Sequence, residues 1–251
     1  MRRMITAFLE AMRSAGKPVR RRLRRITWLR STYYFLLAVK ECIRDNSFNG
    51  RGELNRTFEC RDPWRYAAKL KERERHMSEL AMLDSVLGGK RFETALEIGC
   101  AEGIFTQMLM ERCDSLVAVD ISSIALERAR QRCQRNGRIR FHELDIRVDS
   151  LPGTFDLIVA VHVLEYIRSP FSLRRIRRKL VESLRGGGYL LVANVCNHEF
   201  SESTRWGQYL LRGGKNITVF IGKHPALRVL DSTVLELDDC SSIELLCRKT
   251  Q

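Results

Sequence analysis

One short stretch constrains the fold of this chain more than any other. The largely apolar residues 95–98 include an acid, Glu97, and lead into a turn that holds Gly99 and Gly103, after which a helical pattern covers residues 104–112. Gly99 lets the backbone turn tightly and a ligand approach, and Gly103 leaves room where the new helix packs against the strand. Open α/β sheets bind nucleotides at such strand–turn–helix junctions.

A second strand end adds another acid. Residues 116–119 are apolar and precede Asp120, which lies 21 residues after Gly99. A carboxylate at this place can accept hydrogen bonds from both hydroxyls of a ribose. The alternative is an ordinary βα turn with a chance pair of glycines, but two strand-end acids at this spacing favour a nucleoside cofactor.

The turn lacks the Gly-x-Gly-x-x-Gly pattern of dinucleotide sites. Ala101 replaces the middle glycine, and Ile104 and Phe105 crowd the place of the third. The nearby acids Glu97 and Glu102 disfavour a doubly charged pyrophosphate and suit a cationic ligand without phosphate. S-adenosylmethionine fits, because it joins an adenosine to a sulfonium and an ammonium group.

From about residue 58 to 195 the chain resembles class I S-adenosylmethionine-dependent methyltransferases. The segments that resemble the family's motifs occur in the family's order and are 96–103, 118–122, 144–146, 155–167 and 184–191. A narrower resemblance links Asp62-Pro63-Trp64, 71–75, 97–100, 112–114 and 119–122 to the nodulation-type N-methyltransferases that modify chito-oligosaccharides. It weakens at His162, where an acid would be expected.

The resemblance implies a set of cofactor-binding residues at one edge of the sheet. They are Glu97, Gly99, Cys100, Ala101, Gly103, Asp120, Ile121, Asp145, Ile146 and Val161, together with Arg75 on the preceding helix. Asp145 is expected to meet the adenine amino group, and Arg75 to hold the cofactor's carboxylate. The alternative for Arg75 is an ion pair with Glu72, one helical turn away.

His162 is the candidate catalytic residue. It follows the fourth predicted strand, and an imidazole can accept a proton near neutral pH. A hydroxyl acceptor needs such a base, whereas an amine needs it less. The alternative is a structural histidine that is hydrogen-bonded at a strand end. Glu165 is expected to support the loop, and Asp156 to be structural.

Alternating patterns predict an α/β fold with a parallel sheet. Predicted strands are 93–98, 115–120, 138–143, 155–161 and 188–194, and predicted helices are 103–112, 123–135 and 170–184. A further helix is predicted to begin at Asp62-Pro63 and end near Leu87. The resemblance implies two late strands near 227–230 and 242–247, which complete a Rossmann-like seven-stranded sheet whose last strand is antiparallel. Residues 46–62 are predicted to be a loop, and 196–224 an insert that shapes the substrate pocket.

The charge predicts a division into two parts. The net charge is +14, and residues 1–60, with 14 Lys/Arg and 5 Asp/Glu, contribute +9 of it. We expect a basic helical extension and linker at 1–60 and a methyltransferase domain at 61–251. Residues 1–45 suit contact with an anionic membrane surface, or plain packing on the core, better than nucleic acid.

Cysteine use and hydropathy favour a cytoplasmic protein. The eight cysteines are scattered without a Cys-x-x-Cys pair, so we expect free thiols and no metal site. No apolar run reaches the length of a membrane span, and the first residues do not read as a signal peptide. The predicted function is methyl transfer to an N or O of a small-molecule or saccharide-like acceptor. RNA methylation and a non-catalytic cofactor-binding module are the alternatives.

Overall fold

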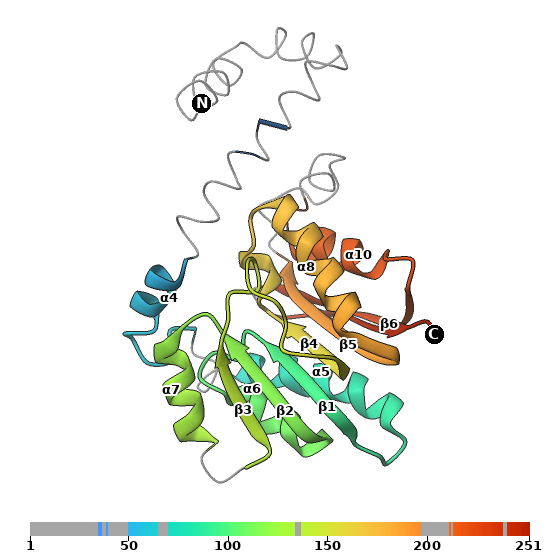
Figure 1. Cartoon of the computed structure of the whole chain (residues 1–251), viewed down its shortest axis with the longest axis horizontal. Coiled ribbons are helices and arrows are strands. Elements are labelled where there is room, and N and C mark those ends of the chain that lie inside the picture. The colour runs from blue at the N-terminus through green and yellow to red at the C-terminus, as the bar shows by residue number, and fades with distance from the viewer. Residues whose placement is uncertain are drawn as a thin grey trace, which may run out of the picture.

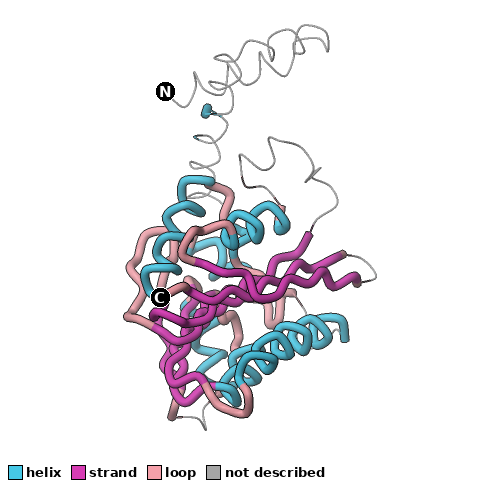
Figure 2. The backbone as a smooth tube through the Cα atoms, turned by 90° about the vertical axis from the view of Figure 1, so that its right-hand side faces the viewer, coloured by secondary structure: helices cyan, strands magenta, loops and turns pink. Residues whose placement is uncertain are grey.

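The computed structural model describes residues 35, 36, 39, 50–64, 70–133, 137–196, 211, 213–237 and 240–251. These form a single seven-stranded sheet with helices on both sides (Figures 1 and 2). The strands are β1 (Phe92–Ile98), β2 (Cys113–Asp120), β3 (Ile139–Glu143), β4 (Phe155–Val161), β5 (Leu184–Cys196), β6 (Leu227–Glu236) and β7 (Ser241–Lys249). The helices are α4 (Arg51–Thr57), α5 (Leu70–Leu87), α6 (Ile104–Leu109), α7 (Ser123–Arg132), α8 (Pro170–Ser183) and α10 (Gly214–Gly222), with short 3-10 turns η1 (Met110–Arg112) and η2 (Leu164–Tyr166).

The strand order is β3-β2-β1-β4-β5-β7-β6. β1 pairs in parallel with both β2 and β4, whereas β7 is antiparallel to β5 and β6. The predicted Rossmann-like seven-stranded sheet with an antiparallel last strand is therefore confirmed. Chain order reverses between β1 and β4, which is the switch point where ligands bind in open α/β sheets.

The central strands β1, β2 and β4 are buried on both faces, because helices cover each side, whereas the edge strands β3 and β6 are largely exposed. Helices α5 and α6 pack on one face through Leu80, Leu83 and Phe105. On the other face, α8 and α10 pack through apolar side chains such as Leu173 and Ile217. Strand residues alternate between these two cores, which is the pattern of a sheet covered on both sides.

Two local predictions were wrong. Residues 46–62 were predicted as a loop, but 51–57 form α4, which lies beside α7 (Figure 1). The Asn55 and Ser122 side chains join the two elements by a hydrogen bond of 2.7 Å. The helix predicted to start at Asp62 is also displaced: Asp62 has a left-handed φ of 45°, and α5 is described from Leu70.

Most of the basic extension predicted at 1–60, including nearly all of 1–45, lies outside the described residues, so its helical form stays a prediction. The same holds for residues 197–210 of the predicted insert. Among the described helices, none is long and apolar enough to cross a membrane.

Candidate active site

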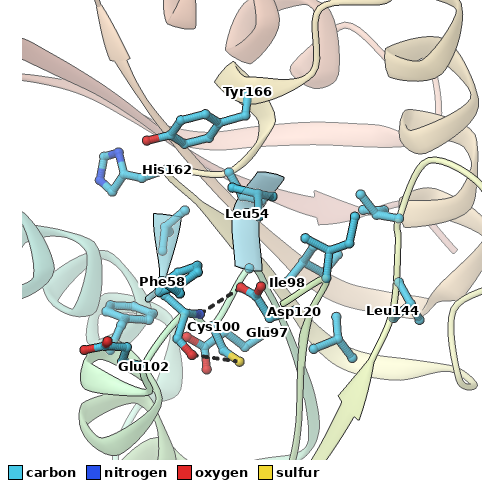
Figure 3. Close-up of a pocket in the computed structure, with 18 of the residues that line it drawn as sticks. Leu54, Phe58, Glu97, Ile98, Cys100, Glu102, Asp120, Leu144, His162 and Tyr166 are labelled. Carbon is cyan, nitrogen blue, oxygen red and sulfur yellow. Dashed lines mark hydrogen bonds between the residues drawn. The ribbon is translucent and has the colours of Figure 1, made fainter. Parts of the chain in front are cut away.

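A pocket opens at the carboxyl ends of β1, β2 and β4, at the switch point (Figure 3). Ten of the predicted site residues line it: Glu97, Gly99, Cys100, Ala101, Asp120, Ile121, Asp145, Ile146, Val161 and His162. Figure 3 shows Glu97, Cys100 and Asp120 grouped at the strand ends, with His162 and Tyr166 above them in that view. The fold therefore brings together residues that are far apart in the sequence.

The turn after β1 is tied to the end of β2. The Asp120 carboxylate accepts hydrogen bonds from the backbone N–H of Ala101 and of Ser122, both at 2.9 Å. Ala101 has a left-handed φ of 47°, so this hydrogen bond holds the turn in a conformation that costs a non-glycine residue free energy. Burial raises the pKa of Asp120, and the hydrogen bonds from Ser122 and Ala101 oppose that rise.

Gly99 has the left-handed φ of 78° that the predicted tight turn requires, and it lines the pocket. A Cβ there would also lie 2.6 Å from Cγ2 of Val163, so a side chain would collide with protein. The prediction for Gly103 was wrong in its packing partner. A Cβ on Gly103 would lie 3.0 Å from Cβ of Ala129 on α7, not against β1. Gly103 is not among the pocket-lining residues. Both glycines let backbone segments pack closely.

Glu97 is a buried acid that forms no ion pair with any described residue. Its side chain is buried, and Oε2 has no hydrogen-bond partner among the described residues. Burial raises the pKa of Glu97 to about 8, and the carboxylates of Asp120 and Glu79 add to the rise. A cationic group of a ligand would reverse this effect, because it stabilises the ionised carboxylate.

Glu102 does not share that role. It was predicted to make the turn suit a cation, and it does line the pocket. However, its Oε1 lies 2.5 Å from Nη1 of Arg128 and accepts a hydrogen bond from the Asp62 backbone N–H. Because Arg128 already balances its charge, the cation preference rests on Glu97 and Asp120.

Asp145 lines the pocket together with Arg147, which the sequence reasoning missed. Nη2 of Arg147 donates to Oδ2 of Asp145 at 2.7 Å, and Nε donates to Oδ1 at 2.9 Å. Burial tends to raise the pKa of Asp145, but the hydrogen bonds and charge of Arg147 prevail and lower it. An Arg147–Asp145 fork thus forms one wall.

Apolar and aromatic side chains close another side. Leu54 and Phe58 come from α4 and its end, and they line the pocket with Trp64 and Tyr166. The Trp64 ring lies 5.0 Å from the Phe58 ring and 6.1 Å from the Tyr166 ring, between centroids. This cover was missed because α4 was predicted as a loop.

Arg75 does not join the pocket lining. It is buried on α5, where Nη2 pairs with Oε2 of Glu72. The ion pair that the helical spacing allowed is therefore present, and a contact between Arg75 and a cofactor carboxylate stays a prediction.

His162 is buried at the end of β4 with a left-handed φ of 51°. Its Nε2 lies 2.6 Å from Oε1 of Glu79, whose Oε2 lies 3.0 Å from Nδ1 of His76. Burial tends to raise the pKa of Glu79, but the two histidines lower it to about 2. The sequence reasoning missed Glu79 and His76, although they lie on the same α5 face as the core residues Leu80 and Leu83.

The comparisons with known proteins fit this geometry. A family model described as Nodulation protein S (NodS) matches residues 48–232. The chain belongs to this family. It is 30% identical over 195 residues to nodulation protein S of Sinorhizobium fredii, covering 78% of this chain and 80% of that protein. It is 37% identical over 154 residues to the Bradyrhizobium diazoefficiens protein, covering 61% and 71%.

A solved structure agrees as well. The N-methyltransferase NodS from Bradyrhizobium japonicum WM9, in complex with S-adenosyl-L-homocysteine, matches with a TM-score of 0.68 and 28% identity, covering 80% of this chain and 98% of that one. As a NodS-family protein, the chain is an S-adenosylmethionine-dependent methyltransferase, as the sequence predicted.

The pocket suits that cofactor. Glu97 and Asp120 offer two buried carboxylates that no described cationic side chain balances, and the lining is otherwise largely apolar. An ammonium and a pair of ribose hydroxyls are the groups that such carboxylates bind.

Proposed function

We propose that the chain transfers the methyl group of S-adenosylmethionine to an amine nitrogen of a chito-oligosaccharide or a related saccharide. The observation that carries the proposal is that one pocket joins the strand-end acids Glu97 and Asp120 to His162. The resemblance to the nodulation-type N-methyltransferases and the match to a solved N-methyltransferase NodS support a nitrogen acceptor.

We assign the cofactor half of the pocket to residues from β1, β2 and the segment after β3. Asp120 would accept hydrogen bonds from the ribose hydroxyls, and Glu97 would bind the ammonium group. Ile121 and Ile146 would contact the adenine, whose amino group would donate to Asp145. Gly99, Cys100 and Ala101 form the backbone wall beside it.

The acceptor half is assigned to His162. When bound, the cofactor supplies a methyl carbon whose bond to sulfur breaks as the acceptor nitrogen attacks. The pocket must align that nitrogen and exclude water, and the apolar cover of Leu54, Phe58 and Tyr166 serves the second purpose. The nitrogen must also lose a proton, for which His162 is the base.

We also propose that residues 1–60 form a basic extension to a domain at 61–251. The net charge of +9 in this segment suits a cytoplasmic protein that contacts an anionic membrane surface. Lipid-linked acceptors would then be presented close to the pocket.

The test is methyl transfer to matched acceptors. The purified chain, with methyl-labelled cofactor, is expected to label a chito-oligosaccharide that has one free terminal amine and not its fully N-acetylated counterpart. Asp120→Ala serves as the inactive control. Equal labelling of the two acceptors would point to a hydroxyl instead, and no labelling of either would reject a saccharide acceptor.

His162→Ala is expected to lower turnover by about 10²-fold, the lower end of the contribution of a positioned base, because an amine needs a base less than a hydroxyl does. Cofactor affinity is expected to stay near the wild-type value, because the acids assigned to the cofactor are untouched. Steady-state kinetics on the amine acceptor and calorimetric titration of the cofactor measure the two quantities. Unchanged turnover would remove His162 from the mechanism.

A further inference from the structure

A buried carboxylate links two histidines of the pocket. Glu79 has no exposed surface and does not itself line the pocket, whereas His76 and His162 both do. One oxygen of Glu79 faces Nδ1 of His76 and the other faces Nε2 of His162. Glu79 therefore has no direct contact with the pocket, and its hydrogen bonds reach the pocket through the two rings.

The charge of Glu79 determines where each ring carries its proton. An ionised carboxylate only accepts hydrogen bonds, so both ring nitrogens that face it must be N–H donors. His76 then carries a proton on Nδ1, and His162 carries one on Nε2. When His162 is neutral, its lone pair is on Nδ1, which is buried and has no hydrogen-bond partner among the described residues.

We propose that Glu79 is a positioning residue for methyl transfer, which holds His162 with Nδ1 as the proton acceptor and stabilises the imidazolium that forms. The inference rests on the proposed function, in which the acceptor is an amine. In that step, the acceptor nitrogen bonds to the methyl carbon while the carbon–sulfur bond breaks and its electron pair stays on sulfur, and the N–H proton passes to Nδ1. The Glu79 carboxylate then balances the new positive charge of the ring and stays ionised.

The place of Glu79 on α5 supports this role over a purely structural one. The buried face of α5 is polar at Glu72, Arg75, His76 and Glu79, and apolar at Leu80, Met82 and Leu83. Of these four polar residues, His76 lines the pocket and Glu79 contacts both pocket histidines. A buried charge lowers stability unless it is paired, so a polar half here is costly for a helix that only needs to pack.

Other charged groups surround this cluster. Glu165 on η2 and Glu244 on β7 interact electrostatically with His162 and with Arg75 on α5, and Glu97 on β1 interacts with Glu79. Only Glu79, within the part of the chain that the structure describes, hydrogen-bonds the His162 ring. No group of three His, Cys, Asp or Glu side chains there has the arrangement of a metal site, so a proton-handling role is favoured over metal binding.

The first test needs no acceptor. Histidine labelled with ¹⁵N distinguishes the two ring nitrogens by NMR, and the wild-type protein is expected to show His162 protonated at Nε2 and His76 at Nδ1. In Glu79→Gln, the protonated nitrogen of one of the two rings must change. The Gln side chain has one acceptor and one donor, so it cannot accept hydrogen bonds from both rings. A wild-type His162 that carries its proton on Nδ1 would overturn the proposal without any variant.

The second test is the pH dependence of kcat on the amine acceptor. Without the carboxylate, the imidazolium of His162 loses its partner. In Glu79→Gln, the acidic limb of the plot of kcat against pH is therefore expected to move to lower pH by about 1–3 pH units. The maximal kcat is expected to fall by at least about tenfold, within the contribution of a positioned base. A purely structural role would lower kcat and leave the limb in place, which would refute the proposal.

Glu72→Gln is the matched control. It also removes a buried carboxylate from α5, but the partner of Glu72 is Arg75 rather than an imidazole, so the acidic limb is expected to stay where it is. In a His162→Asn background, Glu79→Gln is expected to cause little further loss of kcat, because the two residues act as a unit. Additive losses would contradict the proposal. Absence of any amine methylation by the wild type would reject the proposed function and leave the NMR result to judge Glu79.

Discussion

Replacing Glu97 with Gln is expected to abolish a proton release that accompanies cofactor binding. Burial raises the pKa of Glu97 to about 8, so at pH 6.5 the unliganded site is almost fully protonated. A bound ammonium group favours the ionised carboxylate. The wild-type protein should therefore release close to one proton for each cofactor bound, and Glu97→Gln close to none.

The affinity of the wild type should depend on pH for the same reason. Between pH 6 and 7, where the cofactor's ammonium stays protonated, affinity is expected to rise by up to about tenfold per pH unit, because less free energy is needed to ionise Glu97. In Glu97→Gln this slope should vanish. The unliganded wild type should also lose stability as pH rises from about 4.5 to about 8, since the unfolded chain ionises Glu97 first.

Calorimetric titration in two buffers of different ionisation enthalpy measures the released protons directly. Glu102→Gln is the matched control, since Glu102 also lines the pocket but already pairs with Arg128. It should leave the proton count unchanged. A wild-type binding enthalpy that does not depend on the buffer would refute the assignment of Glu97 to the ammonium group.

The other predictions concern the turn, the ribose acid and the N-terminal segment. Asp120→Ala should weaken S-adenosylmethionine binding by roughly 2–4 kcal/mol in a calorimetric titration, through two lost charge-assisted hydrogen bonds; wild-type affinity would exclude the ribose role. Gly99→Ala should destabilise the fold by about 1–3 kcal/mol in urea, because its Cβ meets Val163, and Val163→Ala in the same chain should recover part of the loss. Deletion of residues 1–45 should keep cofactor affinity and reduce sedimentation with anionic vesicles; insolubility would favour a packed segment.

The central strands of the sheet could be predicted from the sequence because they are buried on both faces. Residues 155–161 are all apolar except Asp156, which predicts a buried strand, and they form β4 in the structure. Asp156 is held by Thr94 and Arg185, in keeping with the structural role predicted for it. The length of such a strand is visible in the pattern alone.

Helix α4 could not be predicted in the same way. Its seven residues are mostly polar, it begins after Gly50, and no side chain caps its N-terminus. Its stability comes from tertiary contacts, including the Asn55–Ser122 hydrogen bond and the packing of Leu54 over the pocket. A short helix of this kind is decided by packing rather than by propensity.

The histidine–glutamate cluster was missed for a related reason. Residues 71–79 carry so many charges that they indicate a solvated helix surface. A signal was nevertheless present, because Glu72, His76 and Glu79 share the helical spacing of Leu80 and Leu83 and so lie on the face that packs on the sheet. Charged residues that share the helical spacing of the apolar residues facing the core are expected to be buried themselves. Buried charged residues of this kind indicate a functional site.

The buried face of α5 has one part that stabilises the fold and another part that serves the pocket. The apolar residues that follow Glu79 along α5 contribute to the core. The buried charged residues that precede it destabilise the fold unless each has a partner. Apolar replacement of a whole buried ion pair is often neutral or stabilising, while removal of one partner is destabilising. The polar half of the face is therefore better explained by the chemistry of the pocket that His76 and His162 line than by the needs of the fold.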